Sequence, residues 1–298
     1  MHMNSCKAPF IIFLFCLIFL SRSSAQSMNN ALDDGVIRIL AIGNSFSEDA
    51  IENNLYELAK ASGKKIVIGN LYIGGAPLEL HVKNALGDSS SYSYRKINEI
   101  GVKQVIDKVK ISIALLDEPW DYISFQQASP LSGKYETYSK DLPLLYAYVT
   151  QHVKYPETKY ILHQTWAYQN DADHSGFSLY ERNQNTMYNA IVSTSKRVYD
   201  WGDFSILVPA GTAIQNARTT YIGDHFTRDG YHLNLNYGRF IAACTWYEAL
   251  FNENVKRNSF VPLNISYVES KIAKEAAHFA IMNPYSVTNL SYYSTWTY

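Results

Sequence analysis

The chain has 298 residues, of which 47% are hydrophobic and 18% are charged, and its formal net charge at pH 7 is -1. Acidic and basic residues are interspersed, so the sequence lacks the basic patch typical of nucleic-acid-binding proteins. A chain of this length can bury a hydrophobic core without disulfides or other crosslinks.

The first 25 residues are predicted to be a secretory signal peptide. Lys7 supplies a positive charge, residues 10–20 form an apolar core, and small residues at 23–25 precede Gln26 as a cleavage site. The apolar core is too short to span a membrane. Cleavage would leave residues 26–298 as a single domain in the periplasm or outside the cell, with no stable membrane insertion.

The cysteines fit this interpretation. Loss of the signal peptide removes Cys6 and Cys16 and leaves Cys244 alone, so no internal disulfide is expected. Phe15 stands before Cys16, where lipoprotein processing requires a small residue, so a lipid anchor is not expected either.

Five short apolar segments alternate with helical patterns along the rest of the chain. The predicted strands are 36–42, 65–71, 120–125, 159–163 and 204–208. The predicted helices are 49–62, 97–110, 138–152, 177–199, 210–217, 236–251 and 268–281, and residues 87–94 are expected to form an exposed loop. This alternation predicts an α/β fold, a three-layer α/β/α sandwich of the flavodoxin-like kind with a five-stranded parallel sheet. Right-handed crossovers would bring the carboxyl ends of the strands to one edge.

Ser45 lies where the first strand gives way to a helix, directly after Gly43-Asn44. A serine at the carboxyl end of a parallel strand faces the crevice where open α/β sheets bind ligands, and it can serve as a nucleophile. A structural interpretation is also open. Ser45 and Glu48 fit the capping-box pattern S-x-x-E, in which the serine only satisfies helix N–H groups.

A nucleophilic serine needs a base, and His232 is the first candidate. Asp229 lies three residues before it across a glycine, a spacing that lets the carboxylate hold imidazole Nδ1–H and leaves Nε2 free. The pair could instead be an ordinary turn with a local hydrogen bond. His163 and His225 are competing bases. Asp224 beside His225 could suggest a metal, but no H-E-x-x-H or Cys/His ladder supports one, so no metal is expected.

Three blocks in this order carry a family resemblance: Gly43-Asn-Ser-Phe-Ser47, Gly74-Gly75, and Asp229-x-x-His232. With their spacing, they resemble the SGNH (GDSL-like) hydrolase superfamily, in the branch described as domain of unknown function 4886 (DUF4886). The resemblance extends from about residue 36 to residue 250.

The resemblance implies a Ser-His-Asp hydrolase without a cofactor. Ser45 would attack an ester carbonyl, His232 would take its proton, and Asp229 would orient the imidazole. The oxyanion would be held by the N–H groups of Ser45 and Gly75 and by a side-chain amide. The superfamily uses an asparagine for that amide, whereas this chain has two glutamines, of which Gln127 is the first choice and Gln126 the second.

The resulting expectation is an exported serine esterase that removes small acyl groups, acetyl being favoured, from carbohydrate. The 24 tyrosines and 5 tryptophans suit sugar-like ligands. The residues expected to contact an acylated carbohydrate or other small ester are Asn44, Gly74, His163, Trp166 and Tyr168.

Three alternatives remain open at this point. A carbohydrate-binding protein could keep the fold without turnover, and the glutamine replacement favours it. A lipase or lysophospholipase would need a long apolar groove. A methyl esterase acting on acidic sugars would need basic residues near the site, for which Arg218 and Arg228 are the candidates.

Overall fold

The centre of the protein is a seven-stranded sheet with strand order β4-β3-β2-β1-β5-β6-β7, seen in a computed structural model that describes residues 34–295. β1 (Val36–Gly43), β5 (Tyr122–Phe125), β6 (Lys159–His163) and β7 (Ile206–Val208) pair in parallel, and β2 (Lys65–Tyr72) lies on the other side of β1. These are the five predicted strands, and their order is that of flavodoxin-like sheets.

The prediction of a five-stranded parallel sheet is wrong in number and direction, because a hairpin extends the sheet beyond β2. β3 (Tyr92–Ile97) pairs antiparallel with β2, and β4 (Lys103–Val109) pairs antiparallel with β3. The sheet is therefore mixed.

The same hairpin replaces the helix predicted over 97–110 and part of the loop predicted over 87–94. Gly101 adopts φ +85°, and the Asn98 side chain accepts hydrogen bonds from the N–H groups of Ile100 and Val102, which stabilises the turn. β4 is an exposed edge strand whose β-branched residues suit extended backbone. Helical spacing of apolar residues was misleading here, because these side chains are not packed in a core.

The helices follow the predicted pattern with several changes in their bounds. They are α2 (Ser45–Ile51), α3 (Leu55–Ala61), α4 (Leu78–Leu86), α5 (Ile111–Asp117), α6 (Tyr135–His152), α7 (Gln184–Trp201), α8 (Ala210–Ala217), α9 (Tyr237–Phe251) and α10 (Tyr267–Met282). The single helix predicted over 49–62 is two helices, and the segment 177–199 is divided between a 3-10 turn, η2 (Ser175–Tyr180), and α7. α4 and α5 were not predicted. Shorter 3-10 turns occupy η1 (Ser129–Leu131), η3 (Val255–Arg257) and η4 (Ser291–Thr295).

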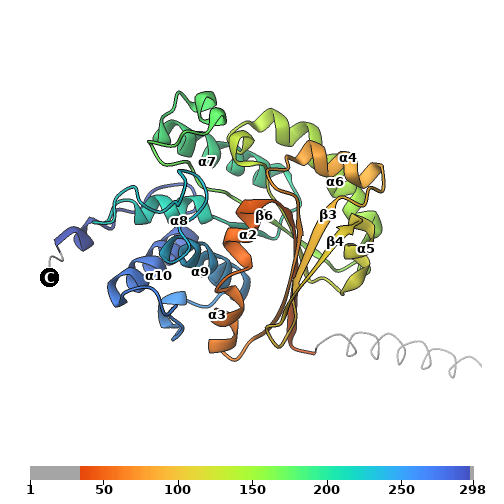
Figure 1. The fold of residues 1–298 in the computed structure, drawn as a ribbon, viewed down its shortest axis with the longest axis horizontal. Helices are drawn as coiled ribbons and strands as arrows, with labels where there is room; N and C mark the ends of the chain where they lie inside the picture. The colour runs from red at the N-terminus through yellow and green to blue at the C-terminus, as the bar shows by residue number, and fades with distance from the viewer. Residues whose placement is uncertain (1–33, 296–298) are drawn as a thin grey trace, which may run out of the picture. The chain divides into compact units, whose positions relative to one another are not determined.

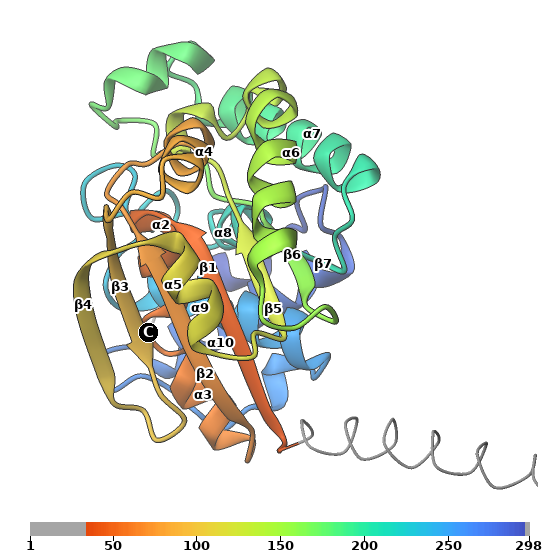
Figure 2. The ribbon, with the colours of Figure 1, turned by 90° about the vertical axis from the view of Figure 1, so that its right-hand side faces the viewer.

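The helices form a layer on each face of the sheet. α2, α3, α8, α9 and α10 lie on one face, and α4, α5 and α6 lie on the other (Figures 1 and 2). α9 is packed against α2, α3, α8 and α10, which explains why its residues are apolar on nearly every side. The C-terminal α10 packs against α8 and α9. The chain after α9 therefore adds to this helical layer.

The predicted signal peptide lies outside the described residues. Within residues 34–295, no helix is long and apolar enough to cross a membrane. Cys244, which would be the remaining cysteine after cleavage, is a buried free thiol on α9, and burial raises its pKa above the ordinary value.

Candidate active site

The turn between β1 and α2, residues 43–47, is here called the serine turn. Its helix cap is Asn44, whose Oδ1 accepts the Phe46 N–H at 3.0 Å. Ser45, the first residue of α2, is therefore not the cap that the S-x-x-E pattern offered as an alternative. A side chain at Gly43 would stand 2.4 Å from Ser47 Oγ, so the turn requires glycine at this position.

The loop after β2 is fastened to the serine turn at two points. Asn44 Nδ2 donates to the Ala76 carbonyl at 3.0 Å, and the Ile73 N–H donates to the Gly43 carbonyl at 3.3 Å. Between these bonds Gly74 and Gly75 are exposed, and Gly75 adopts φ +66°, a conformation that favours glycine. Asn44 itself is 1% exposed and joins the two loops.

A second turn, residues 227–233, is here called the histidine hairpin. Thr227 and Leu233 form an antiparallel bridge, and the Arg228 N–H donates to the His232 carbonyl at 2.8 Å. At its tip Gly230 adopts φ +91°, and its carbonyl accepts the Gln169 N–H at 2.8 Å. The hairpin therefore has a defined backbone that fixes the separation of Asp229 and His232.

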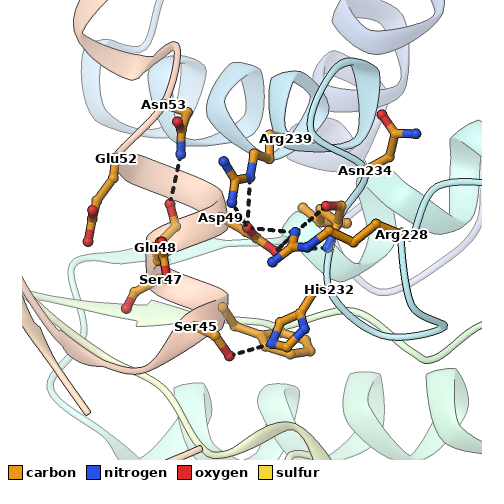
Figure 3. Close-up of polar contacts among 12 residues, drawn as sticks. Ser45, Ser47, Glu48, Asp49, Glu52, Asn53, Arg228, His232, Asn234 and Arg239 are labelled. Carbon is orange, nitrogen blue, oxygen red and sulfur yellow. Dashed lines mark hydrogen bonds and ion pairs between the residues drawn. The ribbon is translucent and has the colours of Figure 1, made fainter. Parts of the chain in front are cut away.

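The histidine hairpin meets the serine turn where the His232 ring bonds Ser45 (Figure 3). His232 Nε2 lies 2.8 Å from Ser45 Oγ, and His232 Nδ1 lies 2.6 Å from Asp229 Oδ2. An ionised carboxylate only accepts, so Nδ1 carries the ring proton and Nε2 can accept the serine O–H.

The carboxyl group of Asp229 is held in its ionised form. Burial alone would raise its pKa, but hydrogen bonds from the His232 ring and from the backbone N–H groups of His232 and Tyr231 outweigh burial, so the pKa is lowered. The two backbone bonds measure 2.8 and 3.2 Å.

The two glutamines after β5 have different surroundings. Gln126 Nε2 donates to Asn44 Oδ1 at 2.8 Å, and Gln126 Oε1 lies 2.7 Å from His163 Nδ1, so this side chain reaches the serine turn. Gln127 instead donates to Thr137 Oγ1 at 3.0 Å and accepts the N–H groups of Leu78 and Ala128. Gln127, the first choice for the side-chain donor, thus bonds residues of α4 and α6, whereas Gln126, the second choice, bonds Asn44, the residue before Ser45.

Besides Asn44, three other residues expected to contact substrate are buried supports. His163, Trp166 and Tyr168 are each 0% exposed. Trp166 stacks on Phe46 with ring centroids 4.3 Å apart and donates to the Tyr231 carbonyl at 2.8 Å. Tyr168 bonds Ser129 at 2.7 Å. Sequence position placed them near the site, but their large apolar surfaces are buried beneath it. In addition, burial lowers the pKa of His163 to about 3.

The side chains beside His232 that are partly exposed are Tyr231 and His174, which the sequence did not single out. The ring centroids of Tyr231 and His232 are 4.3 Å apart, and those of His174 and Tyr231 are 4.9 Å apart. His174 Nδ1 accepts the Gly176 N–H, which leaves Nε2–H as a donor. Desolvation and the neighbouring His232 lower the pKa of His174.

The basic residues considered for an acidic sugar face other groups. Arg218 is buried, and its guanidinium lies 2.8 Å from Asp224 and 3.0 Å from the Ala167 carbonyl. Arg228 contacts Asp49 at 3.1 Å. Both arginines are thus paired with carboxylates of the protein itself. Within the described part of the chain, no group of three or more His, Cys, Asp or Glu residues could hold a metal ion.

Sequence reasoning also missed Asp49 and Arg239. Asp49 is 0% exposed, and Arg239 Nε donates to it at 2.7 Å. The available signal was the position of Asp49, one helical turn after Ser45 and on the same face of α2.

The family model described as "Domain of unknown function (DUF4886)" matches residues 38–280. The chain belongs to the DUF4886 family. This DUF4886 chain is 49% identical to a DUF4886 family protein from Bacteroides uniformis ATCC 8492, with a TM-score of 0.84, covering 86% of this chain and 98% of that one.

More distant similarity extends to other solved structures, LAE5 and Axe2 among them. LAE5, an alpha/beta hydrolase enzyme from the metagenome of Lake Arreo, is 13% identical with a TM-score of 0.46, covering 72% of this chain and 94% of its own. Axe2, an acetylxylan esterase from Geobacillus stearothermophilus, is 11% identical with a TM-score of 0.46. The match covers 76% of this chain and 97% of Axe2. No curated protein matches the DUF4886 chain.

Proposed function

We propose that this protein is an exported serine esterase of the SGNH type that hydrolyses small acyl esters, acetyl esters above all, on carbohydrate. The observation that carries the reaction class is the continuous hydrogen-bonded chain from Ser45 Oγ through the His232 ring to Asp229, with distances of 2.8 and 2.6 Å. A serine alone is a weak nucleophile, and a base oriented by a third group is the arrangement that activates it.

In the proposed reaction His232 Nε2 takes the proton of Ser45 as Oγ attacks the ester carbonyl. The imidazolium then gives that proton to the leaving alcohol, which departs and leaves an acyl group on Ser45. Water, activated by the same nitrogen, releases the acid. Asp229 keeps the ring in the tautomer with the proton on Nδ1 and stabilises the imidazolium.

The oxyanion that forms in each step needs donors placed on one side of Ser45. We assign the N–H groups of Ser45 and Gly75, together with the amide of Gln126. The bonds of Asn44 with Phe46, Ala76 and Gln126 join the three segments that would supply these donors, which supports this assignment.

Carbohydrate is the proposed substrate class because of the side chains beside His232. Tyr231 and His174 are partly exposed, stand nearly perpendicular at 74°, and combine apolar faces with polar edges, as sugar-binding sites do. Export, if the predicted signal peptide acts as one, would place the protein where polysaccharides occur.

The test uses p-nitrophenyl acetate, acetylated polysaccharides with detection of released acetate, and a fluorophosphonate probe. We expect the wild type to turn over the esters and to be labelled, and Ser45→Ala to lose both properties. Ser47→Ala is the matched control and is expected to keep both properties. The Ser47 hydroxyl is buried and bonds the Asn44 carbonyl and the Asn70 side chain. Normal turnover by Ser45→Ala would refute the proposal. A wild type that binds glycans without turnover or labelling would favour a carbohydrate-binding protein.

A further inference from the structure

Asp49 is a buried carboxylate that joins the helix of Ser45 to the hairpin of His232. It lies on α2, four residues after Ser45, and is 0% exposed. Its Oδ2 accepts the Leu233 N–H at 2.8 Å, and both of its oxygens lie 3.1 Å from Arg228 Nη1. Figure 3 shows this carboxylate between Arg228 and Arg239, on the helix that carries Ser45.

These contacts reach both arms of the histidine hairpin. Leu233 directly follows His232, and Arg228 directly precedes Asp229. The Arg228 guanidinium also donates to the Leu233 carbonyl, so one arginine links the arms to each other and to Asp49. From the other side, Arg239 on α9 bonds Asp49 at 2.7 Å and fixes the rotamer of the carboxylate.

Ser45 and His232 are 187 residues apart in sequence, so only tertiary contacts set their separation. The hairpin is also attached through Trp166 Nε1, which bonds the Tyr231 carbonyl, and through Gln169, which bonds the Gly230 carbonyl and the Thr227 hydroxyl. These contacts lead to the loop after β6. The Asp49 cluster, in contrast, leads to the helix of the nucleophile and does not involve the reacting groups themselves.

We infer that Asp49 is a positioning residue that fixes His232 Nε2 at bonding distance from Ser45 Oγ through the Leu233 N–H and Arg228. This inference rests on the proposed function. Because i and i+4 residues share a helix face, the carboxylate and the hydroxyl move as one body. A displacement of about 1 Å between reacting groups costs about 10²-fold in rate, so loss of the attachment acts on turnover and not only on stability.

A matched control is Glu52, the C-cap residue of the same helix. This carboxylate is also buried, and it pairs with Lys103 at 2.6 Å and with Arg95 at 3.4 Å. Its charged partners lie on the β3–β4 hairpin, and its Oε1 also accepts a hydrogen bond from Asn70 on β2 at 2.6 Å. None of these partners belongs to the histidine hairpin. Glu52→Gln therefore removes a buried charge of the same kind without touching the contacts of Leu233.

The experiment compares Asp49→Ala, Asp49→Asn and Glu52→Gln with the wild type. We expect Asp49→Ala to lower kcat on p-nitrophenyl acetate about 10²-fold, with KM changed by less than about threefold. Asp49→Asn keeps an oxygen for the Leu233 N–H and is expected to lose only about tenfold. Glu52→Gln is expected to keep kcat within about twofold, even if its melting temperature falls as far as that of Asp49→Ala.

Amide hydrogen exchange over residues 227–234 gives a readout that does not depend on activity. We expect faster exchange in Asp49→Ala and unchanged exchange in Glu52→Gln. If the wild type itself proves inactive, the proposed function fails while exchange still tests the attachment. Wild-type kcat or wild-type protection of this segment in folded Asp49→Ala overturns the inference.

A second variant covers the case in which Asp49→Ala does not fold. The Arg228 side chain is 32% exposed, so Arg228→Ala is compatible with the fold while it removes the contacts with Asp49 and with the Leu233 carbonyl. We expect kcat about tenfold lower and faster exchange over 227–234. Unchanged values of both in this variant would also overturn the inference.

Discussion

Asn44 leaves Ser45 available for another role by capping α2 itself. Its Oδ1 accepts the Phe46 N–H, and the Ser45 hydroxyl then has His232 as its partner. At the scale of single residues, the site depends on which of two adjacent polar side chains takes the structural position. The same division holds for the glutamines after β5, where Gln127 holds helices and Gln126 reaches the serine turn.

Asp229→Asn tests the orienting role of the carboxylate. An amide can present its N–H to His232 Nδ1, which moves the ring proton to Nε2 and blocks acceptance of the serine proton. We expect kcat to fall about 10⁴-fold with little change in melting temperature, measured on p-nitrophenyl acetate. Asp173→Asn, a change at an exposed carboxylate nearby in the loop after β6, is the control. Comparable losses in the two variants would contradict the assignment.

Gln126→Ala and Gln127→Ala separate the two candidate donors. Loss of one oxyanion donor costs about 10²- to 10³-fold in kcat, so we expect that loss in Gln126→Ala. Gln127→Ala should act mainly on stability, because its bonds join Leu78, Ala128 and Thr137. Kinetics together with thermal unfolding distinguish the two effects, and the reverse pattern would return the role to Gln127.

At the scale of elements, the histidine hairpin depends on a glycine whose replacement would strain the backbone. Gly230 adopts φ +91°, and a Cβ at this position would stand 2.8 Å from both the Cα and the Cβ of Ala172. The hairpin therefore packs against the loop after β6 as closely as backbone geometry permits. This contact and the Asp49 cluster both hold the hairpin in place.

Gly230→Ala is expected to lower the free energy of unfolding by about 2–4 kcal/mol, from unfavourable φ together with a steric clash. It should also lower kcat, because His232 would move with the hairpin. Gly223→Ala is the matched control, since Gly223 has φ +61° but open space around its Cβ position, and its expected cost is about 1 kcal/mol. Urea unfolding measures both variants, and equal costs would show that the contact with Ala172 is unimportant.

At the scale of the whole molecule, two buried histidines link stability to pH. Burial lowers the pKa of His81 to about 4 and that of His163 to about 3. In the unfolded chain such groups titrate near 6.5. As pH falls below about 6.5, the unfolded state therefore binds protons that the folded state does not, and the free energy of unfolding decreases until the folded-state pKa values are reached.

The expected slope is at most about 1.4 kcal/mol per pH unit for each histidine. Urea unfolding between about pH 7.5 and pH 5, above the range where most carboxylates titrate, measures it. His81→Gln should remove one proton from this linkage and flatten the slope. A slope equal to that of the wild type would mean that His81 is protonated in the folded state.

The sequence by itself predicted five strands of an α/β fold and the three segments that meet at the site, because apolar periodicity, glycine turns and short polar motifs are local properties. It could not determine the β3–β4 hairpin, where exposed β-branched residues happened to follow helical spacing. Nor could it separate Gln126 from Gln127 or show that Trp166 and Tyr168 are buried, since these outcomes depend on which neighbours each side chain meets. The meeting of Ser45 with His232, and the buried carboxylate of Asp49 that joins their segments, were decided by tertiary structure alone, because no local interaction acts across 187 residues of chain.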